Sequence, residues 1–155
     1  MRRQIILALA VLSLLASLST LQGQQDRSAW FGTWKVNLAK STFPAPPPFK
    51  RATCRIEPLG NDWKVSYDLV GTRGGVQHFE WTGKLDGIDH ALQGVEAVLT
   101  HAYVWIDDKT YQVIARADGE LVSTTRTVIS PDGKTLTAVT NSKSTPATVL
   151  VYDKQ

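Results

Sequence analysis

The chain contains three histidines, and none of them has the neighbours that a metal or catalytic site requires. His78, His90 and His101 show no His-x-x-x-His spacing. Cys54 is the only cysteine, so no cysteine pair can complete a zinc site. The sequence has neither a Gly-x-Ser-x-Gly elbow nor a phosphate-binding glycine loop. We therefore expect no metal and no cofactor, and the sequence predicts a protein that is not an enzyme.

Two short segments bring carboxylates close to an imidazole, and each has a simpler interpretation. His78 and Glu80 can form an acid–base pair, but they alternate with Phe79 and Trp81, which favours a solvated outer face for them. Residues 86–90 contain two aspartates and a histidine but lack the calcium-loop pattern, and Asp-Gly is typical of a turn. A triad assembled from scattered residues remains an alternative, since geometry defines a triad. We expect no catalytic residue.

His101 is the histidine with the strongest case for a ligand contact. It lies among Leu99, Tyr103 and Trp105, which share its face in a period-two pattern. At such a place it can bind a polar group of a ligand or haem. The alternative, which the pattern favours, is a hydrogen-bonded residue of the wall.

Aromatic residues carry most of the chemical content of the chain. Burial of each ring is worth roughly 2–3 kcal/mol, so the rings can line an apolar pocket or simply fill it. Both interpretations stay open at this point. The rings that fall in or beside strand patterns are Trp34, Trp63, Tyr67, Phe79, Trp81, Tyr103, Trp105 and Tyr111.

Alternation of apolar and polar residues predicts strands and almost no helix. Trp34 and Val36, for example, share a face opposite Lys35. Asp-Gly and other Gly, Asn or Asp turns separate the strand patterns and are too short for parallel crossovers. We therefore predict an all-β fold, an antiparallel up-and-down meander that closes into a barrel of about 8–10 strands. The expected strands are 32–38, 51–57, 62–69, 76–85, 95–106, 110–117, 121–130, 134–142 and 147–154, with a short tenth around 90–93.

Two segments are not expected to form strands. Residues 42–49 contain four prolines, which indicates a stiff link that crosses one end of the barrel. Residues 1–23 combine Arg2 and Arg3 with an apolar run and a small, polar tail, the order of a cleavable signal peptide. Cleavage after residue 19 or 23 is equally plausible, and an uncleaved anchor is the alternative. The expected organisation is a signal over 1–23 and one barrel domain over 24–155.

Charge and cysteine content limit the partners of the mature chain. The formal net charge of +3 includes Arg2 and Arg3, so the mature chain has nearly equal numbers of acidic and basic residues. That balance argues against a nucleic-acid surface. One cysteine excludes an internal disulfide, and its strand position favours a buried, inert thiol. We expect an exported monomer, periplasmic or extracellular, that does not span a membrane after cleavage.

The segment Phe31-Gly32-Thr33-Trp34-Lys35 resembles the opening of lipocalins and fatty-acid-binding proteins, which belong to the calycins. Residues 130–137 resemble one of their late hairpins, and residues 151–154 resemble the last strand of the fatty-acid-binding proteins. The whole chain most closely resembles small exported bacterial lipocalin-like proteins, mostly without assigned function. The resemblance implies a lipocalin-like barrel in which Gly32 and Trp34 are the structural motif.

The resemblance also implies roles for single residues. In calycins the tryptophan that matches Trp34 packs on an arginine from a late strand, for which Arg126 is the first candidate and Arg116 the second. Many fatty-acid-binding proteins hold a carboxylate with an Arg-x-Tyr pair on the final strand. Tyr152 matches that tyrosine, but Leu150 stands at the arginine position, so the pair is broken. The helical cap of those proteins is replaced here by the proline-rich link.

Three classes of function follow from these patterns. The favoured one is binding or carriage of a small hydrophobic or amphipathic ligand inside the barrel. The second is a filled barrel that acts as an interaction or structural module of the cell envelope, and the third is a small enzyme. The predicted ligand contacts are Arg126, His101, Tyr152, Tyr103 and Trp105.

Overall fold

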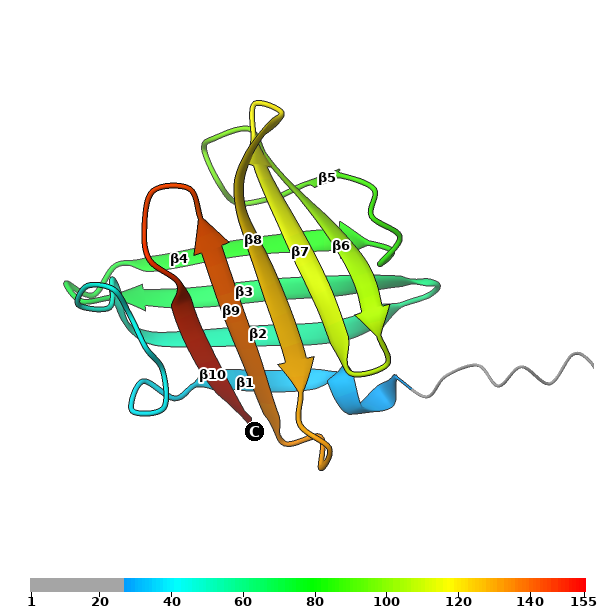
Figure 1. The fold of residues 1–155 in the computed structure, drawn as a ribbon, viewed down its shortest axis with the longest axis horizontal. Helices are drawn as coiled ribbons and strands as arrows, with labels where there is room; N and C mark the ends of the chain where they lie inside the picture. Colours follow the sequence, from blue (N-terminus) through cyan, green and yellow to red (C-terminus); the bar gives the residue numbers. More distant parts are fainter. Residues whose placement is uncertain (1–26) are drawn as a thin grey trace, which may run out of the picture.

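The computed structural model describes residues 27–155, and ten strands account for most of them (Figure 1). The segment predicted to be a signal, 1–23, lies outside the described residues. Between residues 27 and 155 no helix is long and apolar enough to cross a membrane. The strands are β1 (Gly32–Val36), β2 (Phe49–Leu59), β3 (Asp62–Gly71), β4 (Val76–Gly83), β5 (His90–Ala91), β6 (Leu99–Asp107), β7 (Thr110–Ala117), β8 (Glu120–Ile129), β9 (Thr135–Ser142) and β10 (Thr148–Lys154).

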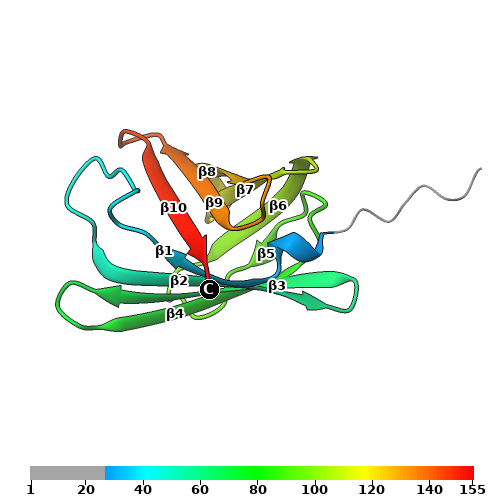
Figure 2. The ribbon, with the colours of Figure 1, turned by 90° about the horizontal axis from the view of Figure 1, so that it is seen from below.

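The strands form one antiparallel sheet in the order β4-β3-β2-β1-β10-β9-β8-β7-β6-β5. Except for β4 and β5, which are the two edges of the sheet, each strand pairs with its neighbour in the chain. β1 also pairs with β10, where Trp34 lies opposite Lys154. Figures 1 and 2 show that β1–β4 form one layer and β6–β10 cross it as a second layer. The predicted all-β meander that closes into a barrel is confirmed.

The barrel is nearly closed, and its seam lies between β4 and β5. Glu80 and Gln93 exchange two backbone hydrogen bonds across the seam, of 3.0 and 2.8 Å. Gly94 follows with φ +84°, and a Cβ at this position would collide with the carbonyl oxygen of His78. Only glycine allows the chain to pass so close to β4. Closure at the seam therefore depends on the close approach of Gln93 and Gly94 to β4.

The strand boundaries differ from those expected at a few places. The strand expected from residue 95 begins at Leu99, because residues 95–98 still belong to the bends after β5. The short tenth strand expected around 90–93 is present as β5. In the proline-rich link, Thr42 exchanges backbone hydrogen bonds with Val149, and Phe43 packs edge-on against Phe49. The link thus lies beside the barrel wall at the end where β1 leaves it.

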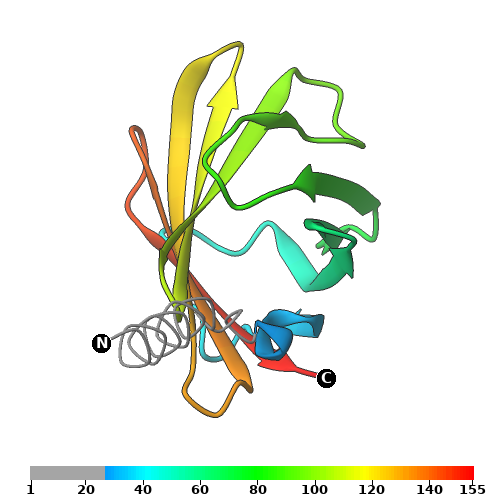
Figure 3. The ribbon, with the colours of Figure 1, turned by 90° about the vertical axis from the view of Figure 1, so that its right-hand side faces the viewer.

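A turn that the sequence did not predict closes the opposite end. A 3₁₀ turn over Ser28–Trp30 precedes β1 and buries Trp30. Figure 3 shows this turn beside the C-terminal end of β10. The Lys154 ammonium donates a hydrogen bond of 2.7 Å to the carbonyl oxygen of Ala29, which joins the two ends of the described chain. The barrel therefore has one plugged end and one end formed by hairpins and the proline-rich link.

Candidate ligand cavity

The interior of the barrel holds a cavity of about 230 Å³. Its walls come from eight strands of both layers, whose inward residues alternate with outward ones as the pleat requires. The cavity has an aromatic side, with four tyrosines and two phenylalanines, and a smaller polar side. The lining residues are Phe49, Cys54, Tyr67, Leu69, Phe79, His101, Tyr103, Tyr111, Val113, Thr125, Thr127, Leu136, Ala138, Thr140, Leu150 and Tyr152.

Tyr103 is a buried aromatic residue of this wall. Its ring stacks on Trp81 with 4.1 Å between centroids, and its side chain is 1% exposed. Among the residues that the structure describes, its hydroxyl finds no hydrogen-bond partner. Burial raises the pKa of Tyr103, and its side-chain contact with Tyr67 offsets part of the rise. The cavity thus contains a protonated, unused hydroxyl.

His101 precedes Tyr103 by two residues on the same face of β6 and also lines the cavity. Its backbone carbonyl accepts a hydrogen bond of 2.9 Å from the Trp81 indole. Its ring Nδ1 is buried and has no hydrogen-bond partner in the described part of the chain. Burial lowers the pKa of His101, so the imidazole is neutral at pH 7. His101 thus lies in the wall, as expected, and its Nδ1 takes no part in a hydrogen bond within the described residues.

The other polar groups of the lining already have partners. The hydroxyls of Thr125 and Thr140 are hydrogen-bonded to each other at 2.8 Å. Tyr111 has a raised pKa, chiefly because it is buried, and a hydrogen bond with Thr127 offsets part of that rise. These contacts join β7, β8 and β9. Among the described residues, the buried lining atoms without a hydrogen-bond partner are the Tyr103 hydroxyl and the His101 Nδ1.

Cys54 and Tyr152 complete the neutral lining. Burial raises the pKa of the Cys54 thiol to about 12, partly offset by a hydrogen bond with Tyr67. The thiol is therefore protonated at neutral pH, in agreement with the expected buried, inert cysteine. Burial also raises the pKa of Tyr152. Leu150, at the position of the arginine in the fatty-acid-binding pair, lines the cavity as an apolar residue.

Two of the predicted ligand contacts do not line the cavity. Arg126 is exposed on the outer face of β8, because Thr125 and Thr127 on either side of it face inward. Trp105 faces inward but lies at the plugged end, in edge-on contact with Trp30 at 5.6 Å. The structure therefore brings together His101, Tyr103 and Tyr152 of the predicted set and separates Arg126 and Trp105 from them.

Trp34 has a cationic neighbour, but it is a lysine. The Lys154 Nζ lies 4.9 Å from the centroid of the Trp34 ring, whose indole donates a hydrogen bond of 3.0 Å to the Trp30 carbonyl. Neither expected arginine takes this place: Arg126 is exposed, and Arg116 pairs with Asp89 at 2.7 Å. The sequence signal that could have found Lys154 is its position in the final strand, which pairs with the first.

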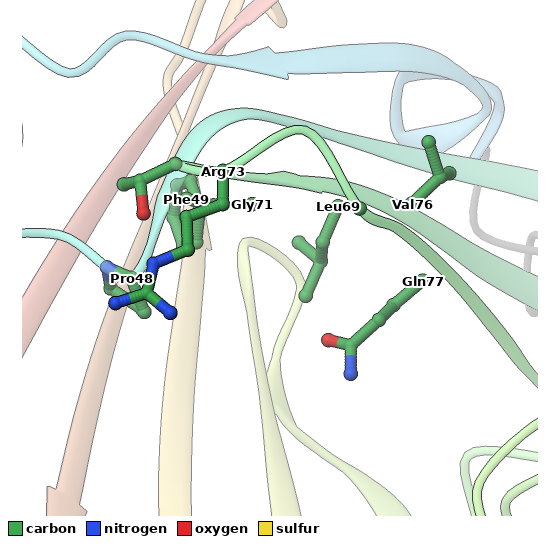
Figure 4. Close-up of a pocket in the computed structure, with 9 residues that line it drawn as sticks. Pro48, Phe49, Leu69, Gly71, Arg73, Val76 and Gln77 are labelled. Carbon is green, nitrogen blue, oxygen red and sulfur yellow. The ribbon is translucent and has the colours of Figure 1, made fainter.

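A second hollow forms the mouth of the barrel and was not predicted from the sequence. Its volume is about 410 Å³, and it shares Phe49 and Leu69 with the interior cavity, so the two adjoin. Figure 4 shows the mouth, with Arg73 and Gln77 as its longest polar side chains. Arg73 is exposed and lies in the turn between β3 and β4. It is a cation at the entrance, outside the interior lining.

The remaining histidine clusters lie on the outer surface. His78 contacts Asp68 at 2.8 Å and Glu80 at 3.6 Å, and Glu80 pairs with Lys64 at 2.8 Å. The hydrogen bond with Asp68 raises the pKa of His78, and the network is exposed, as expected for a solvated face. In residues 27–155 no three His, Cys, Asp or Glu side chains are grouped so that they could hold a metal ion.

No protein-family model matches the sequence, and no curated protein matches it significantly. Solved structures match over most of the chain. The fluorescent protein UnaG aligns with 15% identity and a TM-score of 0.57, covering 83% of this chain and 98% of its own. A fatty-acid-binding protein of Schistosoma mansoni in complex with arachidonic acid aligns with 12% identity and a TM-score of 0.59, covering 83% of this chain and 97% of its own.

A third match is a secretory abundant heat soluble (SAHS) protein of Ramazzottius varieornatus. It aligns with 11% identity and a TM-score of 0.64, covering 82% of this chain and 96% of its own. All three are calycin-type barrels, and identities this low establish the fold alone. Together with the ten-stranded meander, they show that the described chain folds as a calycin-type β-barrel, as the resemblance of its opening segment implied.

Proposed function

We propose that this protein is exported and binds a small hydrophobic or amphipathic molecule inside its barrel. The observation that carries the proposal is the interior cavity of about 230 Å³, lined mainly by apolar and aromatic side chains. A concave, mostly apolar site with a few convergent polar groups is the usual form of a small-molecule site. The unused hydroxyl of Tyr103 supplies such a group.

The route into the cavity supports binding rather than a filled barrel. The mouth adjoins the cavity at Phe49 and Leu69, so the side chains of these two residues lie between the two hollows. Small rotations of these side chains can therefore admit a molecule without breaking the sheet. A filled-barrel interaction module needs neither a mouth nor an internal cavity.

The comparisons support the same function by analogy of fold. The Schistosoma mansoni fatty-acid-binding protein has a barrel of the same type and was solved in complex with arachidonic acid. Binding proteins among the neighbours fit a protein that is not an enzyme, and the described residues that line the cavity include no Asp, Glu, Lys or Arg. Export is proposed on the pattern of residues 1–23 alone, with a periplasmic or extracellular location.

The test is a fluorescence titration of residues 24–155 with uncharged, environment-sensitive dyes. Ala138 lies in the cavity wall and is 6% exposed, so Ala138→Trp fills the cavity. Val128 is 38% exposed on the outer face, so Val128→Trp is the matched control. We expect saturable binding by the wild type and the control, and loss of binding in Ala138→Trp.

Folding of each variant is checked by cooperative thermal unfolding, because an overpacked core can lose stability. If Ala138→Trp does not fold, Thr140→Leu, a substitution of the same wall with less added volume, replaces it. Absence of dye binding to the folded wild type would overturn the proposal and favour the filled-barrel module.

A further inference from the structure

We propose that the ligand is an uncharged alcohol or phenol of about ten carbon atoms, whose hydroxyl meets Tyr103 and His101. This inference rests on the proposed function and specifies its ligand. It differs from fatty-acid binding in the charge of the polar end and in the size of the apolar part. Three observations carry it.

The first observation is the pair of unused polar atoms. The Tyr103 hydroxyl and the His101 Nδ1 are both buried without a hydrogen-bond partner in residues 27–155. Burying a polar group without a partner is unfavourable, and native proteins leave few such groups. The two residues are two positions apart on one face of β6, so their side chains project into the same cavity.

A hydroxyl suits these two atoms better than any other simple group. It donates one hydrogen bond and accepts others, and so does the Tyr103 phenol. The neutral His101 ring offers either an acceptor or a donor at Nδ1, depending on its tautomer. One ligand hydroxyl can therefore satisfy both atoms whichever tautomer is present.

The second observation is the absence of charge in the lining. Among the described residues that line the cavity there is no Asp, Glu, Lys or Arg, and the buried Cys54 and tyrosines are held in their neutral forms. Burying a carboxylate without a cation is costly. Leu150 adds an apolar side chain to this lining. The interior therefore disfavours an ionised ligand.

The third observation is size. A cavity of about 150 Å³ accommodates benzene, and this cavity holds about 230 Å³. A bicyclic aromatic molecule or a short alkyl chain is thus the largest ligand that the interior can enclose. A longer ligand has to continue past Phe49 into the mouth.

The experiment compares three probes with the same bicyclic ring by isothermal titration calorimetry at pH 7. The probes are 2-naphthol, naphthalene and 2-naphthoate, which carry a hydroxyl, no polar group and a carboxylate. We expect 2-naphthol to bind about tenfold more tightly than naphthalene, the worth of one good hydrogen bond. We expect 2-naphthoate to bind more weakly than both.

Two matched variants test whether the hydroxyl of 2-naphthol contacts the hydroxyl of Tyr103. Tyr103→Phe removes the unused hydroxyl, so we expect 2-naphthol to lose about tenfold in affinity while naphthalene is unchanged. Tyr111→Phe removes a hydroxyl that already interacts with Thr127, so we expect the preference for 2-naphthol to persist. A wild type that binds naphthalene and 2-naphthol equally overturns the hydroxyl contact but leaves the proposed function intact.

A charged ligand is the other outcome that would overturn the inference. If 2-naphthoate binds most tightly and Arg73→Gln abolishes its binding, the ligand is an anion held at the mouth. Failure of all three probes together with the uncharged dyes would instead reject the proposed function. The results therefore distinguish a wrong ligand class from a protein that binds no ligand.

Discussion

Lys154 lies against Trp34, with its Nζ 4.9 Å from the ring centroid and hydrogen-bonded to the Ala29 carbonyl. This contact joins the first strand, the last strand and the 3₁₀ turn at the plugged end. The cation is thus placed over a tryptophan face that is itself fully buried. The contact stabilises the closure of the barrel by a cation–π interaction and a charge-assisted hydrogen bond.

We expect Lys154→Ala to lower the free energy of unfolding by about 1–2 kcal/mol, since it removes both interactions. Lys35→Ala, on the outer face of β1, is the control and should change the free energy little. Urea unfolding followed by tryptophan fluorescence measures both. Equal effects of the two substitutions would contradict a specific role for Lys154.

Tyr103→Phe should stabilise the ligand-free protein, by up to about 1 kcal/mol, because it removes a buried hydroxyl without a partner. Tyr111→Phe should destabilise it, because its hydroxyl interacts with Thr127. The two free energies of unfolding are measured under identical conditions without ligand. Loss of stability in Tyr103→Phe would mean that its hydroxyl has a partner in solution.

Substituting Gly94 and Gly119 by alanine compares two costs: an unfavourable φ alone, and an unfavourable φ combined with a steric collision. Both have positive φ, +84° and +83°, but a Cβ at Gly94 meets the carbonyl oxygen of His78, and nothing lies within 4 Å at Gly119. Gly119→Ala should cost roughly 1 kcal/mol for the unfavourable φ alone. Gly94→Ala should cost clearly more, because the seam between β4 and β5 must shift. Similar unfolding midpoints for the two variants would show that the seam is loose.

The pH dependence of stability should contain a contribution from His101. Burial lowers the pKa of His101 below its ordinary value of 6.5, so the unfolded chain binds a proton at a pH where the folded chain does not. The His101 contribution to stability is therefore present above pH 6.5 and is lost as pH falls through the folded pKa.

His78 opposes this contribution, because the hydrogen bond with Asp68 raises its pKa. The stabilisation that His78 contributes is present below pH 6.5 and is lost as the pH rises through the raised pKa of His78. The measurement is the difference in stability between wild type and His101→Gln from pH 5 to pH 8. We expect the wild type to lose stability relative to the variant on acidification, and a constant difference would exclude a shifted His101.

The strands and the inward positions of His101 and Tyr103 follow from alternation, whereas Tyr152 was predicted from the resemblance to fatty-acid-binding proteins. Leu99, His101, Tyr103 and Trp105 share an apolar face, and the structure turns that face inward. Arg126 could not be placed in the same way, because the middle of its strand, residues 123–127, is polar on both faces. Thr125 and Thr127 face the cavity, so the apolar pattern gives no indication of which side is inside.

The sequence pattern also does not show how far along the barrel axis a side chain lies. Trp105 has the right face but lies with Trp30 at the plugged end, which depends on a 3₁₀ turn without a sequence pattern. The mouth residue Arg73 is exposed in a turn, where periodicity carries no information. Both positions depend on which hairpins share an end of the closed barrel.

The most direct test of the ligand cavity is methyl NMR of residues 24–155 titrated with 2-naphthol. Leu69, Val113, Leu136 and Leu150 line the cavity, whereas Leu121 and Val122 are exposed. We predict saturable shifts at the four cavity residues and unchanged methyl signals at the two exposed ones. Shifts confined to the exposed residues would contradict a ligand site inside the barrel, and no shifts at all would contradict 2-naphthol as a ligand of that site.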